Sequence, residues 1–373
     1  VPDDSSVTYA KLGNDIPLGN RNLLINGEFD IDQRGLASST AFQAGAHYVA
    51  DRWSYYINSG AFATFSANHE ISDEAPSGFT KSLKVTCTSG SSIPATGEVI
   101  YRQKIEGYNI KRLGYGTPSA KSLTLSFWIK ASVTGDYGVQ LIYEADDSTE
   151  KYYVSKYTVN SANTWEYKTI TIPPNTADAF KYTTTGLGAQ IYWDLGEGST
   201  YSGTADSGWT NTYYNGLSGG VKLMENTGAT WQKTGVQLEV GAKATPFEHR
   251  SYGEELAKCQ RYFQRLNSNT CEAHYLEVNT QYVFMKIQTV RSMRTLPSVS
   301  CPDFRTRYLS TDDSASAGVS RTSTGYTPHG NYSDTAKQEN FNMSNMFIYC
   351  AGASFNRQAG GYCWGDFSLD AEL

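Results

Sequence analysis

Short segments of alternating apolar and polar residues, each bounded by turn-forming residues, make up most of this chain. An alternation of period two is typical of strands that bury one face, and clusters of glycine, proline, asparagine, aspartate and serine end such strands. The clearest segments are Lys81–Cys87, Val99–Ile105, Leu123–Ala131, Gly138–Glu144, Tyr152–Val159, Trp165–Ile172 and Leu187–Leu195. Their number and spacing predict a mainly β fold, a β-sandwich of the jelly-roll kind.

The parity of these segments predicts which side chains face the core. The inward sets are Leu123, Leu125, Phe127 and Ile129, then Val139, Leu141 and Tyr143, and then Ala189, Ile191 and Trp193. The alternate positions, Trp128 and Tyr192 among them, are predicted to point outward.

The stretch 231–266 marks the end of the sandwich. Residues 232–240 alternate as a strand, and Gly241 and Pro246 stop it. Ser251 and Glu254 then form the pattern of a capping box at a helix start. Apolar residues recur at steps of three or four from there to Leu266, which predicts an amphipathic helix. We therefore divide the chain into an N-terminal connecting arm (1–20), a sandwich (21–250), a linking helix (251–266) and a C-terminal β tip domain (267–373).

The smaller C-terminal domain also shows strand patterns. The expected strands are Tyr275–Val278, Tyr282–Thr289, Val299–Cys301, Arg305–Leu309, Asn345–Cys350 and Tyr362–Leu369. Between them, residues 310–340 form a long segment rich in Ser, Thr, Asp and Gly. Loops of that length in compact domains either serve a function or are disordered.

Several motifs resemble the repeated adhesive domain of tailed-phage fibre and appendage proteins. NLLINGEFD (22–30), QRG (33–35) and DRW (51–53) resemble the segment that opens this domain, and GVQLEVGAKATPFEHRSYGEELAKCQRYFQRL (235–266) resembles the one that closes it. Residues 99–108 and LTLSFWIKAS (123–132) fit between them. The resemblance covers residues 20–266 and implies a virion protein with a jelly-roll fold related to carbohydrate-binding modules.

The composition excludes some partners. A formal charge of −6 gives no basic footprint for nucleic acid or for an anionic membrane surface. No apolar run is long enough to insert into a membrane. Because the chain begins at Val1, we expect a fragment or trimmed product of a longer polypeptide.

The six cysteines are sparse and form no CxxC pair. Buried free thiols are the favoured interpretation, and a disulfide among the C-terminal cysteines is the alternative.

Catalytic motifs are weak. Gly216–Gly220 fits a nucleophile elbow around Ser218, but its flanks predict neither the buried strand nor the helix that this motif needs. Glu144, Asp146 and Asp147 contain the two acids of a glycosidase, yet a solvated turn explains them as well. The five histidines form no closely spaced ligand set. We expect no enzyme.

The resemblance also implies a structural calcium ion near the opening segment and the last strand of the sandwich. Glu28, Asp30 and Glu239 are the residues there that supply hard oxygen ligands. The alternative is that these acids cap turns in solution.

Glycan binding is the favoured role. Aromatic rings stack on the apolar faces of sugars, and amide and carboxylate side chains bind hydroxyls. Trp128 and Tyr192, with Gln140, Glu144 and Asp194, are predicted to share one outward face. The competing interpretation is a subunit contact, because aromatic residues are also enriched in interfaces. In the long C-terminal segment, Tyr326, His329, Asn331 and Tyr332 form a second candidate receptor site.

These expectations combine into one hypothesis. The chain is predicted to be a distal tail-fibre or appendage component of a phage virion that attaches to a bacterial surface glycan. The resemblance implies a homotrimer, whose N-terminal arms contact other virion tail proteins. The alternatives are a capsid or tail structural protein without a receptor, and a polysaccharide depolymerase.

Overall fold

The computed structural model divides the chain into two compact units, Val1–Glu255 with Leu373 and Leu256–Glu372. It describes residues 19–35, 40–266, 273–274, 278–279, 282–288, 290–295, 298–300, 305–308, 321–322, 345–351, 361–364 and 367–373. Most of the predicted N-terminal arm lies outside the described residues, as do Tyr326, His329, Asn331 and Tyr332.

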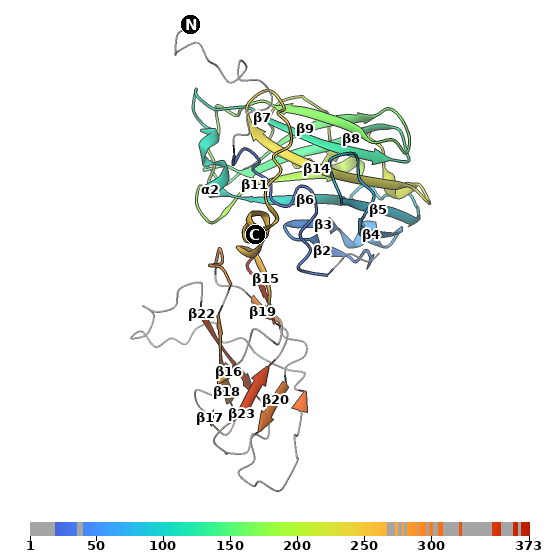
Figure 1. The fold of residues 1–373 in the computed structure, drawn as a ribbon. Helices are drawn as coiled ribbons and strands as arrows, with labels where there is room; N and C mark the ends of the chain where they lie inside the picture. Colours follow the sequence, from blue (N-terminus) through green and yellow to red (C-terminus); the bar gives the residue numbers. More distant parts are fainter. Residues whose placement is uncertain are drawn as a thin grey trace. The chain divides into compact units, whose positions relative to one another are not determined.

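The first unit is a sandwich of two six-stranded antiparallel sheets (Figure 1). Sheet A has the order β1 (Thr40–Ala41), β4 (Ser66–Ser72), β5 (Ser82–Ser89), β14 (Thr230–Val240), β7 (Leu123–Ala131) and β10 (Glu166–Ile172). Sheet B has the order β2 (Gly45–Ala50), β3 (Trp53–Ile57), β6 (Val99–Glu106), β11 (Leu187–Asp194), β8 (Gly135–Glu144) and β9 (Glu150–Val159). The mainly β fold that the sequence predicts is therefore confirmed.

The strand boundaries follow the alternation closely. All seven predicted segments are strands, and β7 has the predicted bounds. The predicted inward sets on β7, β8 and β11 are all buried in one core. Between strands lie the short helices α1 (Ser59–Phe62) and α2 (Gly107–Ile110), the 3-10 turns η3 (Lys111–Leu113), η4 (Ser199–Tyr201) and η5 (Leu223–Glu225), and the parallel two-residue strands β12 (Ser202–Gly203) and β13 (Gly216–Leu217).

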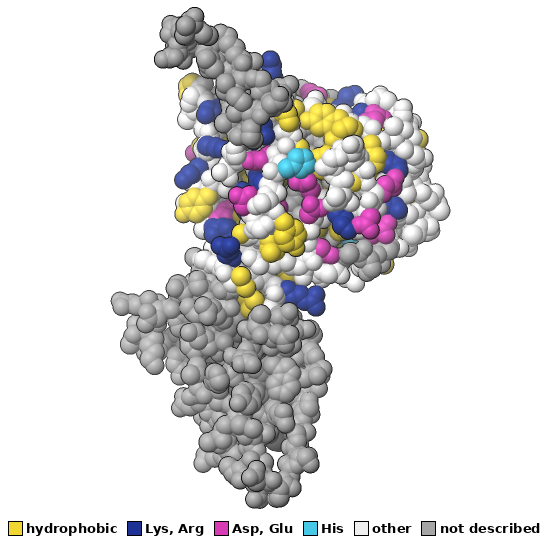
Figure 2. Space-filling view, in the orientation of Figure 1, with side chains coloured by type: hydrophobic (Ala, Val, Ile, Leu, Met, Phe, Trp, Pro, Cys, Tyr) yellow, Lys and Arg dark blue, Asp and Glu magenta, His cyan; other side chains and the backbone are white. Residues whose placement is uncertain are grey.

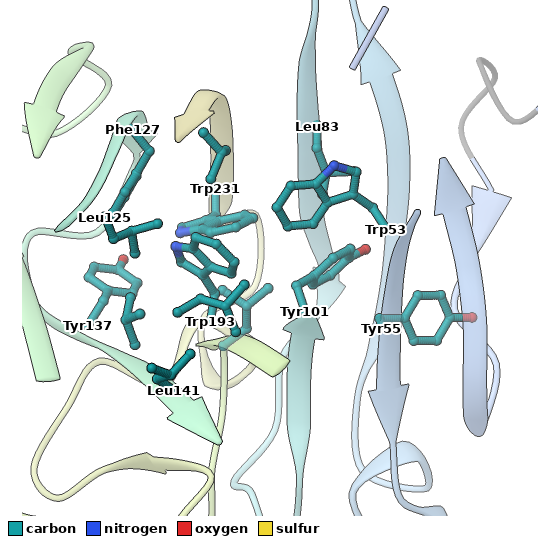
Figure 3. Close-up of a cluster of buried hydrophobic side chains, with 14 of the residues drawn as sticks. Trp53, Tyr55, Leu83, Tyr101, Leu125, Phe127, Tyr137, Leu141, Trp193 and Trp231 are labelled. Atoms are coloured by element: carbon teal, nitrogen blue, oxygen red, sulfur yellow. The ribbon is translucent and has the colours of Figure 1, made fainter. Parts of the chain in front are cut away.

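The core between the sheets is rich in aromatic side chains. Figure 3 shows Trp53, Tyr101, Trp193 and Trp231 next to one another between the strands. Trp53 and Trp193 have ring centroids 5.6 Å apart, and the Trp231 indole donates to the Tyr157 hydroxyl at 2.9 Å. Large rings of this kind supply most of the apolar area that such a core buries.

One lysine lies inside this core. The Lys233 ammonium nitrogen sits 3.4 Å from the Trp193 ring centroid and 4.0 Å from that of Trp53, and no described group forms a hydrogen bond with it. Burial lowers its pKa well below the usual lysine value.

A bulge in β14 explains why this lysine is inside. The register with β7 shifts between Thr234 and Gln237, and Gly235 in the bulge has φ +60°. Simple alternation from Val236 and Leu238 back along the strand predicts that Lys233 faces out. The extra residue reverses the parity, so Lys233 points inward. The period-two pattern is thus wrong at this end of β14.

The linking helix is shorter than predicted. Helix α3 spans Tyr252–Gln260, and Phe263–Leu266 form strand β15 instead of two further helical turns. The predicted cap is confirmed, because the Ser251 hydroxyl donates to the Glu254 carboxylate at 2.9 Å and the Ser251 N–H donates to it at 3.2 Å. Phe263 and Leu266 are buried in the strand. Their spacing fits a helix, but pairing of β15 with β24 (Phe367–Asp370) overrides it.

The second unit is built from small sheets. Their orders are β15-β24-β19 (Ser298–Ser300), β16 (Ala273–His274)-β23 (Gly361–Trp364)-β20 (Arg305–Tyr308)-β21 (Arg321–Thr322), and β17 (Val278–Asn279)-β18 (Tyr282–Gln288)-β22 (Asn345–Ala351). The predicted strand 362–369 is two strands, β23 and β24. Within the described residues, no helix has the length and apolarity needed to span a bilayer.

Candidate functional site

An aromatic pair lies on the outer face of sheet A. Trp128 on β7 is directly opposite Tyr167 on β10, and their ring centroids are 5.4 Å apart. Trp128 is partly exposed and Tyr167 is 44 % exposed. The pair therefore presents two adjoining apolar rings to solvent, whereas Phe127, the other aromatic residue of these two strands, is buried in the core.

Polar groups surround this pair on the same face. Thr169 and Thr171 follow Tyr167 along the outer side of β10 and are exposed. On β14, Gln232 is opposite Lys130, and both side chains contact the carboxylate of Glu74. The exposed Thr169 and Thr171 hydroxyls and the half-exposed Glu74 carboxylate thus lie on the same face as the rings, and a sugar-binding surface needs polar groups of this kind. Gln232 is buried on that face.

The prediction that Trp128, Tyr192, Gln140 and Asp194 share one outward face is wrong. Trp128 belongs to sheet A, whereas Tyr192, Gln140 and Asp194 belong to sheet B. Tyr192 and Gln140 are opposite one another on β11 and β8, as their parity predicts. Tyr192 is only 5 % exposed, however, and Gln140 is fully buried.

A loop buries these residues. Residues 196–221, which we call the covering loop, include β13, and β13 packs on β8, β9 and β11. The Thr210 backbone pairs with that of Tyr152 at the β9 edge, and the Tyr213 and Tyr152 rings lie 5.6 Å apart. Beneath the loop, Ile100, Ile142, Tyr152 and Tyr192 form an apolar cluster separate from the main core. Strand parity predicts the side of the sheet to which a side chain points, but it does not predict whether a loop packs over that side chain.

Three carboxyl groups lie where this loop meets sheet B. They belong to Glu98, Asp194 and Glu197, and we call them the carboxyl cluster; each is at most 6 % exposed. Burial raises the pKa of Asp194 to about 6. Burial, with the neighbouring charges of Asp194 and Glu98, raises the pKa of Glu197 well above its usual value.

Of the three predicted calcium ligands, Glu28 and Asp30 line one pocket, and Glu239 is not among its lining residues. Glu239 accepts hydrogen bonds from the Thr245 N–H at 2.8 Å and the Thr245 hydroxyl at 2.6 Å. The Asp30 carboxylate accepts one from Thr80, and that of Glu28 pairs with His249 at 3.0 Å. Burial raises the pKa of Glu28. No three acidic, histidine or cysteine side chains within the described residues are arranged to hold a metal ion.

Arg250 occupies the position between the opening and closing segments that a cation would take. Its guanidinium donates to the backbone carbonyls of Asn22 and Leu24 and forms ion pairs with Glu248 and Glu255 at 3.2 and 3.0 Å. Two carbonyls and two carboxylates also suit calcium. Because the guanidinium already engages them, the residues present do not fit a calcium ion here.

A small pocket adjoins this arginine. Its volume is about 60 Å³, and its lining includes Asn26, Glu28, Asp30, Phe247 and Arg250. Figure 2 shows one side of the sandwich, on which apolar, acidic and basic side chains are interspersed and acidic groups lie beside a histidine.

The catalytic motifs are not assembled into a site. Ser218 follows the two-residue strand β13, and the next helical element is the three-residue turn η5. Glu144 pairs with Lys181. Hydrogen bonds from Thr149 lower the pKa of Asp147, which is the opposite of what a general acid requires.

Sequence reasoning missed Tyr167. Its segment is predicted as a strand, and the inward parity of Ile170 and Ile172 was the signal that could have placed Tyr167 on the outer face. What the sequence lacked was the pairing of β10 with β7, which places this ring opposite Trp128.

Comparison with known proteins gives structural matches only. No protein-family model and no curated protein sequence matches the chain. The family 22 carbohydrate-binding module of Clostridium thermocellum Xyn10B covers 61 % of this chain and 99 % of its own, at 11 % identity and a TM-score of 0.31. A family 4 carbohydrate-binding module covers 58 % of this chain and 97 % of its own, at 18 % identity and a TM-score of 0.28.

A phage protein is also similar. The enzymatically active domain of bacteriophage CBA120 tailspike protein 4 is matched over 59 % of this chain and 21 % of that one, at 12 % identity and a TM-score of 0.29. Similarity at this level assigns neither a family nor a function to this chain.

Proposed function

We propose that this chain is a non-enzymatic component of a phage virion, part of a tail fibre or similar appendage, and that its sandwich binds a bacterial surface glycan. The observation that carries the binding function is the solvent-facing pair of Trp128 and Tyr167 on the outer face of sheet A. The virion location rests on the resemblance of the opening and closing segments to phage adhesive domains.

The pair suits a sugar for physical reasons. An exposed aromatic ring stacks on the apolar C–H face of a pyranose, and the exposed threonine side chains of β10 and the Glu74 carboxylate match its hydroxyl groups. The site is a shallow surface, so single-site affinity is weak. A homotrimer carrying three copies would raise the apparent affinity through avidity.

The test is binding of the isolated protein to a glycan array and to host cells. The variant W128A/Y167A is expected to bind at least tenfold more weakly than wild type, because each ring contributes more than about 1 kcal/mol in a typical hot spot. Tyr108→Ala is the matched control, since Tyr108 is 48 % exposed but lies outside sheet A. Unchanged glycan binding by W128A/Y167A would show that the binding site does not lie on the outer face of sheet A.

Further variants distinguish the alternatives. If Y326A/Y332A loses cell adsorption while W128A/Y167A keeps it, the receptor site belongs to the C-terminal segment. If no glycan binds and W128A/Y167A changes the oligomeric mass, the pair is a subunit contact in a structural protein. A fall in polymer length after incubation with host polysaccharide would make the protein a depolymerase.

A further inference from the structure

We propose that the covering loop is a pH-dependent lid over the outer face of sheet B, closed while the buried Asp194 and Glu197 carboxyl groups are protonated and released when they ionise. This inference concerns the face opposite the Trp128–Tyr167 pair, and it stands whether or not that pair binds a glycan.

The carboxyl cluster is the point at which the loop is fastened. The Asp194 carboxylate at the end of β11 accepts the N–H groups of Gly196 and Leu217, each at 2.9 Å, and so joins both ends of the loop to the sheet. Glu98, just before β6, accepts hydrogen bonds from the Asn215 amide at 2.9 Å and the Tyr213 hydroxyl at 2.6 Å. Asp194 and Glu98 thus hold four residues of one loop.

Glu197, at the start of the covering loop, lies close to Gly216 of the same loop, which also contacts Asp194. A Cβ added to Gly216 would lie 2.2 Å from the Glu197 Cβ and 2.6 Å from Asp194 Oδ2, so these groups are in close contact. Neither carboxyl oxygen of Glu197 has a well-formed hydrogen bond within the described residues, and the Val99 backbone is the nearest donor. A buried carboxylate in that position has little to stabilise its charge.

The surroundings contain too little positive charge to balance three carboxylates. The covering loop contains no lysine or arginine, and its other acid is Asp206. Lys222, just past the loop, is the cation that acts on Asp194 and Glu197, and its ammonium lies 3.8 Å from Glu225. The titratable groups that face the cluster include Tyr56, Tyr157 and Tyr192 from sheet B, Tyr213 from the loop, and Lys222.

Protonation therefore favours closure. Burial raises the pKa of Asp194 to about 6 and outweighs the opposing effect of the N–H groups that this carboxylate accepts. Burial also raises the pKa of Glu197 well above its usual value. A raised pKa in the closed state means that closure is stabilised fully below the ordinary carboxyl pKa and loses that contribution as pH rises through the raised values. Closed, the lid buries Tyr192, Tyr152 and Ile142, and the Gln140 amide, which has no hydrogen-bond partner among the described groups.

The test is hydrogen–deuterium exchange of the full chain at pH 5 and pH 8.5, with protection factors corrected for intrinsic exchange rates. In wild type, peptides from residues 196–221 are expected to lose at least tenfold protection at the higher pH, while β7 peptides stay protected. Glu197→Gln cannot ionise and is expected to keep most of the loop protection at pH 8.5. Equal wild-type protection at both pH values would overturn the proposal, as would the same loss in Glu197→Gln.

Two further variants and one addition complete the design. Gly216→Ala should expose the loop at both pH values, and a loop that stays protected would show that it does not rest on the cluster. Glu144→Gln, an acid of β8 paired with Lys181, should behave as wild type, and loss of the pH response there would contradict a local latch. Restoration of protection at pH 8.5 by added calcium would also contradict it, because a metal ion rather than protons would then close the lid.

Discussion

The two outer faces of the sandwich are made of similar strands but end in opposite states. On sheet A, Trp128 and Tyr167 meet across neighbouring strands and stay open to solvent. On sheet B, Tyr192 and Gln140 also meet across neighbouring strands, but the covering loop buries them. Strand parity is equally clear on both sheets. Whether a face is exposed to solvent therefore depends on the segment that packs over it.

The largest expected loss of stability comes from removing Arg250, which joins the opening and closing segments of the sandwich. Arg250→Ala leaves Glu248 and Glu255 without their cation and frees the backbone of residues 22–24. Removing one partner of a buried ion pair costs about 3–5 kcal/mol, so we expect a fall in Tm of roughly 10 °C by thermal denaturation. Both faces should lose order together.

The matched control for that prediction is Arg112→Ala. Arg112 also donates to two backbone carbonyls, those of Asn20 and Arg21 just before the opening segment, but these contacts are exposed. Its loss should change the free energy of unfolding by about 0.5 kcal/mol or less. Equal effects of the two variants would show that Arg250 is an ordinary surface arginine.

The next substitution should affect sheet A and leave the covering loop on sheet B unchanged. Gly235→Ala places a Cβ at φ +60° and 2.6 Å from the Phe79 ring, in the bulge that sets which residues of β14 face outward. Strain of this kind costs about 1–3 kcal/mol. We expect faster hydrogen exchange in β14 and β7 and an unchanged covering loop. Faster exchange in the loop instead would mean that the faces are coupled.

A smaller change in the free energy of unfolding, of opposite sign, is expected for a substitution in the core between the two sheets. Lys233→Met replaces an amine that has no hydrogen-bond partner among the described groups with a side chain of similar shape, and should raise the free energy of unfolding by about 1–3 kcal/mol at pH 7. Chemical denaturation measures this. A destabilised variant would show that attraction between a charged lysine and the tryptophan rings outweighs its burial.

The same lysine gives a pH signature. Its folded-state pKa is lowered, so between that value and the unfolded value of about 10.4 the unfolded chain binds more protons. Wild-type stability should therefore rise with pH in this window, by up to about 1.4 kcal/mol per pH unit for one proton. The advantage of Lys233→Met should shrink as pH increases toward 10. A constant advantage would contradict a neutral buried lysine.

The smallest expected effect is that of chelation. Since Arg250 engages the carbonyls and carboxylates that would suit calcium, EDTA should leave the Tm of the sandwich unchanged at both faces. A fall in Tm on chelation, reversed by calcium, would show that a bound metal ion stabilises the fold.

The sequence predicted local structure well and three-dimensional neighbours poorly. Alternation identified β7, β8 and β11 and their buried sets, and the Ser251–Glu254 pattern identified the start of α3. It failed where a single residue changes the parity, as at Gly235, and where pairing replaces a helix, as at Phe263.

The candidate site was predicted only in part, for a related reason. Parity assigned Trp128 and Tyr192 outward, but it contains no information about which sheet a strand joins. Strand order joins Trp128 with Tyr167 and separates it from Tyr192. The cover over Tyr192 comes from a segment with no regular pattern, so periodicity could not reveal it.

The most direct test of this account is a hydrogen-exchange footprint of wild-type protein with a bound oligosaccharide of the host surface at pH 5. We predict new protection on β7 and β10, around Trp128 and Tyr167, and no change in residues 196–221. Protection confined to the covering loop, β8 and β9, with sheet A unchanged, would contradict it, because the face described as closed would then be the one that binds.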